Sequence, residues 1–419
     1  MEVRPGYKQT EVGVVPDDWE APLLDRLAKR GSGHTPDKKH PEYWNGSIKW
    51  ISLADSPALD RGFIDDTFAT VTPEGIANSS AVVHPAGTVV LSRDAGVGKS
   101  AIMRTEMAVS QHFIAWYCGP ELCNRYLYYW LQLAKPQFER IADGTTIKTI
   151  GLPYFRDLRI PKPPLHEQHA IADALRDVDG LLDGLDRLIA KKRDLKQAAM
   201  QQLLTGQTRL AGFSGEWEVK RLGELGAFLK GSGVKKDEAQ SGELPCVRYG
   251  EIYTHHNDYV RAFNSWISRE VADTATPLRR GDILFAGSGE TKEEIGKCVA
   301  FVDDLGAYAG GDIVILRPTG VDSLFLGYLL NTPAVASQKA SQGQGDAVVH
   351  ISASALASIN LSLPNLDEQT RIAEVLSDMD AELAALEARR DKTRDLKQAM
   401  MQELLTGKTR LVPAGAAHG

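Results

Sequence analysis

The chain has 419 residues and a formal net charge of −7. This length is sufficient for two or three domains with sizeable hydrophobic cores. The negative charge argues against a uniformly basic nucleic-acid-binding surface, but it leaves room for local basic patches such as the one predicted between Arg26 and Lys49.

Residues 1–160 have the character of a mixed α/β domain. Short apolar runs such as GTVVLS, residues 87–92, are separated by Gly, Pro, Asp and Asn, which indicates strands and turns. The opening residues contain no apolar run typical of a signal peptide, and no stretch approaches the roughly 18 apolar residues of a membrane span. We therefore expect a soluble, cytoplasmic protein whose first globular domain covers residues 1–160.

One segment of this domain matches a nucleotide-binding motif only in part. AGVGKS, residues 95–100, ends like a phosphate-binding loop, but Arg93 occupies the position that requires glycine. A nucleotide-hydrolysing enzyme built on this loop is an alternative that a turnover assay would expose. Isolated histidines such as His112, His255 and His256 have no recognisable nucleophile or metal-ligand partner, and we interpret them as ordinary polar or core residues.

The cysteines give no sign of a metal site. The chain has four, which show neither paired CxxC spacing nor a zinc-type arrangement with histidines. We expect buried free thiols. The four positions are Cys118, Cys123, Cys246 and Cys298.

Residues 161–210 are predicted to form one long helix. From Ile171 onward the apolar residues recur at alternating steps of four and three, which is the heptad spacing of a coiled coil. The spacing slips at Lys191 and resumes at Leu195, and the helix is expected to end at Gly206. The predicted seam consists of Ile171, Leu175, Val178, Leu182 and Leu185.

Residues 211–361 are predicted to form a second mixed α/β domain. GDILFA, residues 281–286, and GGDIVILRP, residues 310–318, have the apolar pattern of strands. The first of these runs corresponds in position to GTVVLS, so the two globular domains resemble each other weakly.

Residues 362–411 are predicted to form a second long helix. RDLKQAMMQELLTGKTRL, residues 394–411, nearly repeats RDLKQAAMQQLLTGQTRL, residues 193–210, and the likeness extends upstream through both helices. Residues 412–419 are expected to be a flexible tail. The predicted seam of the second helix consists of Ile372, Leu376, Met379, Leu383 and Leu386.

The repeat predicts an α+β architecture. Two mixed α/β domains are joined by two long helices that pair as an antiparallel coiled coil, because a compact domain returns the chain near its entry point. The layout is expected to be nearly circular and to have an approximate two-fold axis. The segment GVVPDDW, residues 13–19, should then lie near the end of the second helix.

The residues alone predict bipartite binding rather than catalysis. No acid–base pair, catalytic triad or cofactor motif stands out, and two unlike domains on a repeated frame suit the reading of two sites on one long polymer. The main alternative is a coiled-coil scaffold that joins two protein-binding domains without DNA recognition. Such a scaffold would show no salt-dependent binding of duplex DNA.

Several segments together resemble the DNA-specificity subunits of type I restriction-modification systems. The resemblance is carried by the repeated EQ-x-x-I-A and RDLKQA-x-MQ-x-LLTG-x-TRL segments, by the opening GxVPDDW and by GDILF followed by IGK. It implies a subunit that is not an enzyme and in which each target-recognition domain reads one half of a split DNA sequence. It also implies that the helices set the gap between the two halves and dock two adenine methyltransferase subunits.

The resemblance further implies partners that carry the chemistry. A methyltransferase subunit would flip the adenine and use S-adenosylmethionine, and a nuclease and translocase subunit using ATP and Mg²⁺ would join for restriction. This chain itself is expected to need no cofactor and no metal.

Candidate DNA-contacting residues follow from chemistry, because Arg and Lys suit guanine and phosphate whereas Asn and Gln suit adenine. In the first domain they are Arg30, Lys38, Lys39, Tyr43, Arg93, Lys99 and Lys148. In the second domain they are Lys235, Lys236, Arg248, Tyr249, Lys292, Gln342, Gln344 and His350.

Overall fold

The structure, a computed structural model, describes residues 4–144, 148–345 and 348–411. The chain divides into two compact units. Unit 1 comprises residues 1–186 and 388–419, and unit 2 comprises residues 187–387. Each unit therefore contains one globular domain and half of each long helix. The predicted tail at residues 412–419 lies outside the described residues.

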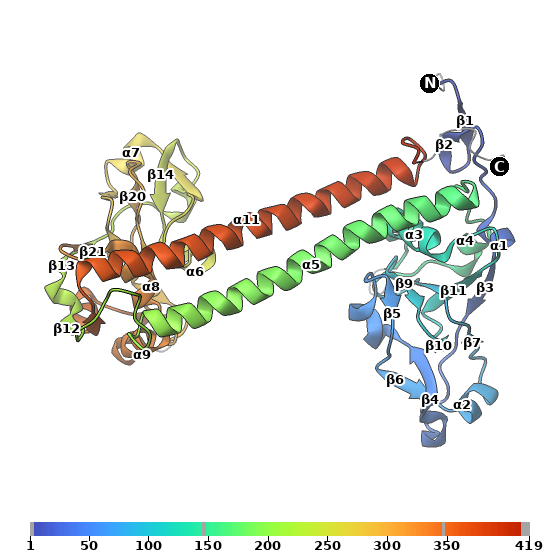
Figure 1. Cartoon of the computed structure of the whole chain (residues 1–419), viewed down its shortest axis with the longest axis horizontal. Helices are drawn as coiled ribbons and strands as arrows, with labels where there is room; N and C mark the ends of the chain where they lie inside the picture. Colours follow the sequence, from blue (N-terminus) through green and yellow to red (C-terminus); the bar gives the residue numbers. More distant parts are fainter. Residues whose placement is uncertain (1–3, 145–147, 346–347, 412–419) are drawn as a thin grey trace. The chain divides into compact units, whose positions relative to one another are not determined.

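Unit 1 is built around a five-stranded sheet with the order β3-β11-β8-β9-β5 (Figure 1). Its strands are β3 Ala28–Ser32, β5 Phe63–Ile64, β8 Val89–Ser92, β9 Ser100–Met103 and β11 Phe113–Cys118. All neighbouring pairs are antiparallel except β5 with β9. A second sheet has the order β6-β4-β10-β7, and β1 pairs with β2 in an N-terminal hairpin. These strands are β1 Tyr7–Thr10, β2 Gly13–Pro16, β4 Trp44–Ile51, β6 Ala69–Val71, β7 Val83–His84 and β10 Met107–Val109.

Helices cover one face of the five-stranded sheet in unit 1. Val89 and Leu91 of β8 share a core with the helix α3, whereas Val90 packs on the opposite side with residues of the second sheet. Because successive side chains of a strand point to opposite faces, this sheet is buried on both sides. The helices and turns of the domain are α1 Leu24–Leu27, η1 Pro41–Tyr43, η2 Leu53–Ala58, α2 Pro73–Ala77, α3 Asn124–Ile141 and α4 Leu152–Arg156.

Unit 2 repeats this arrangement with an antiparallel sheet of the order β13-β21-β17-β19. These strands are β13 Gly226–Lys230, β17 Ile283–Ala286, β19 Cys298–Ala300 and β21 Ile313–Pro318. Further strands are β12 Glu218–Arg221, β14 Leu244–Val247, β15 Ser265–Ile267, β16 Thr276–Pro277, β18 Ser288–Gly289, β20 Tyr308–Ala309, β22 Val349–His350 and β23 Asn360–Leu363. The helices and turns are η3 Leu222–Glu224, η4 Lys236–Glu238, α6 Tyr249–Thr254, α7 Arg269–Ala272, α8 Ser323–Leu330, α9 Pro333–Gln342 and α10 Ala353–Ala357.

The apolar runs predicted as strands are confirmed. GTVVLS contains β8, GDILFA contains β17 and GGDIVILRP contains β21. β8 and β17 occupy equivalent central places in their sheets. The segment AGVGKS forms the turn between the antiparallel strands β8 and β9, so it cannot be the strand–loop–helix of a phosphate-binding loop.

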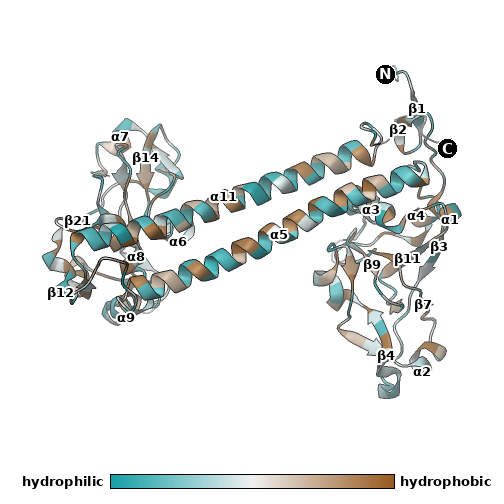
Figure 2. Cartoon of the chain, in the orientation of Figure 1, coloured by the Kyte–Doolittle hydropathy of each residue, from teal (hydrophilic) through white to brown (hydrophobic). Residues whose placement is uncertain are grey.

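The two long helices are α5 Leu165–Leu203 and α11 Leu366–Leu404. Both are continuous through the change in heptad phase, and hydrophilic residues interrupt the hydrophobic ones along each (Figure 2). Each helix ends three residues before the expected glycine, because the chain first makes a turn. Gly206 and Gly407 then adopt the left-handed conformation, each with φ of +71°.

The helices pair in antiparallel fashion within each unit. In unit 1, Asp179 of α5 pairs with Lys397 at 2.5 Å, and Asp186 with Arg390 at 3.7 Å. As the residue number rises along α5, it falls along α11. In unit 2 the same holds for Lys192 with Glu382 and Lys196 with Asp380, at 2.6 and 2.8 Å.

The predicted seam residues differ in burial. Ile171, Leu175, Leu185, Ile372, Leu376 and Leu383 are buried, whereas Val178, Leu182, Met379 and Leu386 are half-buried. Ile171 and Leu175 pack in one core with Leu404 of the other helix.

Both ends of the chain belong to unit 1. The Tyr7 hydroxyl donates to the carbonyl of Gly407 at 2.8 Å, and Arg410 pairs with Asp18 at 2.8 Å. The segment GVVPDDW therefore lies beside the end of the second helix, as predicted from the repeat.

The four cysteines are free thiols. Three are buried and Cys118 is half-buried, and burial raises the pKa of Cys246 to about 12. In the described part of the chain, no group of His, Cys, Asp and Glu has the arrangement of a metal site. No helix there combines the length and apolarity needed to cross a membrane.

Candidate nucleic-acid interface

A short edge of unit 1 brings together three segments that are far apart in the sequence. Asp143 and Thr149 exchange both backbone hydrogen bonds, at 3.1 and 2.8 Å, just after α3. The amide of Ile150 then donates to the carbonyl of Arg93 at 2.9 Å, and the amide of Arg93 donates to the carbonyl of His112 at 2.9 Å. We call the place formed by these five residues, Arg93, His112, Asp143, Thr149 and Ile150, the edge of unit 1.

Unit 2 contains the same backbone arrangement. Gln344 and His350 exchange both backbone hydrogen bonds, at 3.0 and 2.8 Å, just after α9. The amide of Ile351 donates to the carbonyl of Gly287 at 3.0 Å, and the amide of Gly287 donates to Asp312 at 2.7 Å. We call the place formed by these five residues, Gly287, Asp312, Gln344, His350 and Ile351, the edge of unit 2.

The edge of unit 1 carries a chain of polar side chains. The carboxylate of Asp94 pairs with Arg93 Nε at 3.4 Å and with His112 Nδ1 at 2.7 Å. Gln111 lies 3.4 Å from the other ring nitrogen of His112, and its side-chain oxygen accepts from the Thr35 hydroxyl at 2.6 Å. Asp94 is only 8% exposed, so its carboxylate holds the side chains of Arg93 and His112 from the buried side of the edge.

The edge of unit 2 carries different polar groups in the same place. The hydroxyl of Ser288 lies 2.9 Å from His350 Nδ1. These two residues line a pocket of about 490 Å³ together with Gln342, Gln344 and Asp312. Three of the predicted residues therefore meet at one pocket, although they were chosen separately by side-chain chemistry.

The other candidates of the first domain are scattered. Lys38 lies in a pocket with Gln111 and His112, so it is adjacent to the edge of unit 1. Arg30 instead pairs with Asp25 at 3.1 Å, and Lys99 donates to the carbonyl of Ser56 at 3.2 Å. The remaining candidates are Lys39 and Lys148, which are exposed, and Tyr43, which is half-buried and stacks on His40.

The remaining candidates of the second domain lie on other parts of its surface. Lys235 and Lys236 are exposed beside η4, and Lys292 is exposed after β18. Arg248 and Tyr249 stand at the start of α6, where the Arg248 amide donates to Glu251 at 3.3 Å. None of these five residues lines the pocket at the edge of unit 2.

Sequence reasoning missed five residues of the two edges. His112 was interpreted as an ordinary histidine, and Thr35, Asp94, Gln111 and Ser288 were not chosen. Their common feature is a place on the folded edge, set by backbone bonds between distant segments. No local sequence signal identifies such a place.

The ends of the long helices are held by an equivalent buried ion pair in both units. Glu167 has no exposed side-chain surface, pairs with Arg410 at 2.6 Å and accepts from the Trp19 indole at 3.1 Å. The hydrogen bond to Glu167 raises the pKa of Arg410 above its usual value. In unit 2, Glu368 is equally buried and pairs with Arg209 at 2.5 Å.

A further pair of contacts repeats along the helices. In unit 1 the Tyr129 hydroxyl donates to Asp179 at 2.8 Å, and in unit 2 the Tyr328 hydroxyl donates to Asp380 at 2.6 Å. Each globular domain is thus fastened to the helix that follows it by an equivalent tyrosine.

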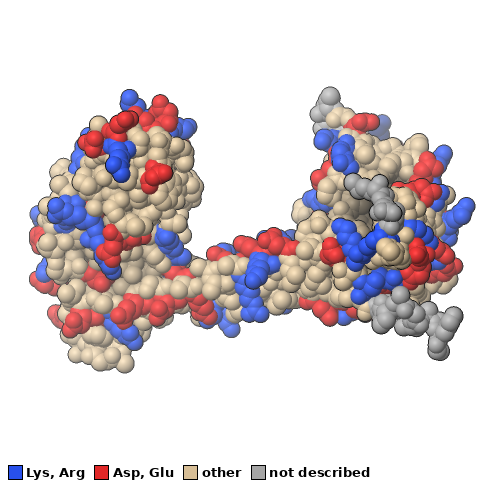
Figure 3. Space-filling model, turned by 90° about the horizontal axis from the view of Figure 1, so that it is seen from above, with Lys and Arg blue, Asp and Glu red and all other residues tan. Residues whose placement is uncertain are grey.

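The surface is of mixed charge on the face that Figure 3 shows. Lys and Arg side chains are interspersed with Asp and Glu over the globular parts and along the helices (Figure 3). Recognition of an anionic polymer on this face must therefore rely on local groups rather than on one broad basic area.

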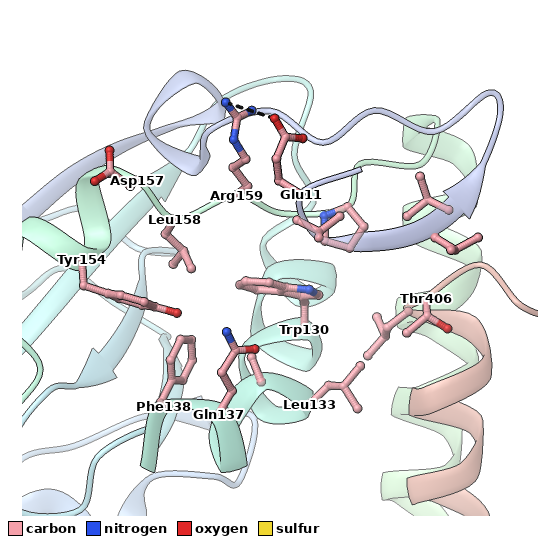
Figure 4. A pocket seen from close by; sticks show the side chains of 16 residues that line it. Glu11, Trp130, Leu133, Gln137, Phe138, Tyr154, Asp157, Leu158, Arg159 and Thr406 are labelled. Atoms are coloured by element: carbon pink, nitrogen blue, oxygen red, sulfur yellow. Dashed lines mark ion pairs between the residues drawn. The ribbon is translucent and has the colours of Figure 1, made fainter. Parts of the chain in front are cut away.

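A separate pocket of about 540 Å³ in unit 1 is lined by both apolar and charged residues. Trp130, Phe138 and Tyr154 line it, and Arg159 and Glu11 form an ion pair there at 3.8 Å (Figure 4). None of the predicted DNA-contacting residues lines this pocket.

Comparison with known proteins gives two matches to one family profile. The family described as "Type I restriction modification DNA specificity domain" matches residues 16–191 and 214–393. Each match covers one globular domain with most of the long helix that follows it.

Individual relatives are similar over different lengths. The chain is 24% identical over 424 residues to the type I restriction enzyme MjaVIII specificity subunit of Methanocaldococcus jannaschii, covering 95% of this chain and 94% of that subunit. It is 26% identical over 262 residues to the MjaIX specificity subunit of the same organism, covering 58% of this chain and 60% of that subunit. The fold resembles that of the crystal structure of the type I restriction-modification S subunit from M. genitalium, with a TM-score of 0.57, 16% identity and coverage of 96% and 98% of the two chains.

Proposed function

The chain belongs to the type I restriction-modification DNA specificity family, and from this premise we propose that it reads a split DNA target, one half-site with each unit. The observation that carries this proposal is the double match of the family profile, once over each globular domain. The repeated edges support it, because two equivalent surfaces with different side chains suit two different half-sites.

We assign the two target-recognition domains to residues 1–160 and 211–361, and the helical frame to residues 161–210 and 362–411. The subunit recognises DNA and assembles with other subunits, and it is not itself an enzyme. Methylation with S-adenosylmethionine and restriction with ATP and Mg²⁺ belong to its partners. Recognition of DNA places its action in the compartment that holds the DNA, which we take to be the cytoplasm.

The proposed DNA contacts comprise the residues of both edges together with the basic residues near them. Phosphate contacts would come from exposed lysines, and base contacts from the more rigidly held edge residues. In unit 1 the candidates are Arg30, Lys38, Lys39, Tyr43, Arg93, Lys99, Lys148 and the added His112 and Gln111. In unit 2 they are Lys235, Lys236, Arg248, Tyr249, Lys292, Gln342, Gln344, His350 and the added Ser288.

The salt dependence of duplex binding tests this function against the scaffold alternative. We expect the chain, in complex with its methyltransferase partner, to bind a labelled duplex with an affinity that falls by about 10³- to 10⁵-fold between 50 and 200 mM salt if it makes six to ten phosphate contacts. Fluorescence anisotropy at several salt concentrations measures this. Absence of duplex binding at 50 mM salt would favour the scaffold.

The frame has exposed leucines at equivalent positions of the repeat, and the most exposed of these pairs is Leu195 with Leu396. Leu195 is 47% exposed and Leu396 is 55% exposed, and both follow Arg-Asp in the segment RDLKQA. Large apolar side chains that are exposed at equivalent places suit a repeated protein contact. We propose that each contributes to docking one methyltransferase subunit, which gives two per chain, and that restriction subunits join this assembly.

Native mass measurement tests the docking proposal. The wild-type chain should bind two methyltransferase subunits, and Leu195→Asp or Leu396→Asp should each reduce the number to one. Val219→Asp is the matched control, because Val219 is 68% exposed but lies on β12 outside the helices. A single methyltransferase on the wild-type chain under saturating conditions would contradict the two-site proposal.

A further inference from the structure

The two edges differ in side-chain chemistry where their backbones agree. At the equivalent core positions the residues stay apolar: Val89 and Leu91 of β8 correspond to Ile283 and Phe285 of β17. The strand ends of the two units carry equivalent backbone hydrogen bonds, but the side chains there differ in chemical class between the units.

The charge of the side chains at the strand ends differs between the two units. Arg93 and Asp94 of unit 1 stand where unit 2 has Gly287 and Ser288, and His112 stands where unit 2 has Asp312. The backbone is held in the same way in both units, so packing does not demand this change. Side chains that vary on a retained backbone are suited to setting which ligand is bound.

Arg93 is positioned as a base-reading residue would be. Its amide and carbonyl are both hydrogen-bonded, and its Nε atom faces Asp94 at 3.4 Å. Among the described residues, no partner is found for the two terminal nitrogens of Arg93, and its side chain remains 18% exposed. A guanidinium held by its Nε atom presents its terminal nitrogens as a planar fork, which matches the O6 and N7 atoms of guanine.

We propose that Arg93 reads a guanine in the half-site of unit 1 and that Asp94 is its positioning residue. Asp94 is suited to this role because His112 binds the second oxygen of its carboxylate at 2.7 Å, so the carboxylate is fixed from two sides. In unit 2 the glycine at the corresponding place provides no such fork. This inference rests on the proposed function, because it names the base that one unit recognises.

Mapping of methylated adenines tests the inference in the assembled complex with the methyltransferase partner. Arg93→Gln should abolish the requirement for guanine at one position of one half-site, a preference expected to be roughly 5- to 150-fold in the wild type. The other half-site should be unchanged. Arg93→Lys should weaken the guanine preference without abolishing it while binding keeps its dependence on salt, because lysine retains the charge and can still donate to guanine but lacks the planar fork. The Lys variant also keeps the test decisive if Arg93→Gln fails to fold.

Two further variants separate reading from a structural role. Asp94→Asn should weaken the same guanine preference without changing any other position of the target. Arg104→Gln is the control, because Arg104 is an exposed arginine of unit 1 that pairs with Asp65 at 2.9 Å away from the edge.

The possible outcomes are distinct. An unchanged target in both Arg93 variants, or uniformly weaker methylation with no change in the bases required, would overturn the inference while leaving the proposed function standing. A wild-type complex whose methylation shows no sequence requirement would overturn the proposed function, and this inference with it.

Discussion

Glu167 and Glu368 are buried carboxylates, each matched by one arginine that follows the opposite helix. Removing the arginine would leave a buried charge without compensation, which typically costs about 3–5 kcal/mol. We therefore expect Arg410→Met to lower the free energy of unfolding of unit 1 by about that amount, as measured by denaturant unfolding. Arg104→Met removes an arginine from an exposed pair and should change it by no more than about 0.5 kcal/mol. If both variants lowered the free energy of unfolding equally, burial of the Glu167 carboxylate would not be the reason for the effect of Arg410→Met.

Asp380 makes the stability of unit 2 sensitive to acid. Burial alone would raise the pKa of Asp380, but hydrogen bonds from Lys196, Tyr328 and Arg261 outweigh it and hold the pKa below its usual value. A carboxyl group whose pKa is lowered by folding contributes stability above its unfolded pKa of about 4, and this contribution is lost as the pH falls through the folded value.

Asp380→Asn should therefore destabilise unit 2 at pH 7 by about 1–3 kcal/mol, because charge-assisted hydrogen bonds are lost. The difference from the wild type should shrink as the pH falls below about 4. Unfolding measured at pH 7 and pH 3 tests this. Asp378→Asn, which changes an exposed carboxyl group on the same helix, should have no effect at either pH.

At the scale of elements, a glycine inside a long helix and a glycine just after one have opposite roles. Gly180 lies inside α5, and a Cβ atom there would meet nothing within 4 Å, so Gly180→Ala should stabilise unit 1 by about 0.5–1 kcal/mol. Gly407 has φ of +71°, and a Cβ atom would lie 2.5 Å from Pro16 Cδ. Gly407→Ala should therefore destabilise the same unit by about 1–2 kcal/mol or more. Thermal unfolding of both variants decides this, and a melting temperature that moves in the same direction for both would be inconsistent with it.

The elements were predictable from sequence where their signal is local. Heptad spacing and the repeat located both long helices, and apolar runs between turn residues located β8, β17 and β21. The helices end three residues before the expected glycines, because the turn before Gly206 continues the apolar pattern of LLTG, and they begin four residues after the predicted segments do.

The candidate interface could be predicted only in part. Side-chain chemistry selected Arg93 and His350, but not His112 or Ser288, because the edges are defined by backbone bonds between segments distant in the sequence. The same chemistry selected Arg30, which pairs with Asp25 in the folded unit. The sequence alone does not show whether a basic side chain such as that of Arg30 already pairs with a carboxylate of its own domain.

At the scale of the whole molecule, the chain consists of two units that repeat one set of contacts with different surfaces. In unit 1 the N-terminal arm supplies Trp19, whose indole donates to Glu167 and which lies against Gly407. In unit 2 the equivalent tryptophan, Trp217, lies against Gly206. Because each unit has its own cores, the globular domains should be exchangeable one at a time.

The most direct test of this account is the mapping of methylated adenines by the assembled complex, for the wild-type chain and for a chain in which residues 1–160 are replaced by the equivalent domain of a relative with a different target. The account predicts a wild-type target of two fixed blocks of bases separated by unspecified ones, of which the replacement changes one block and leaves the other intact. A single continuous target, or a replacement that changes both blocks together, would contradict it.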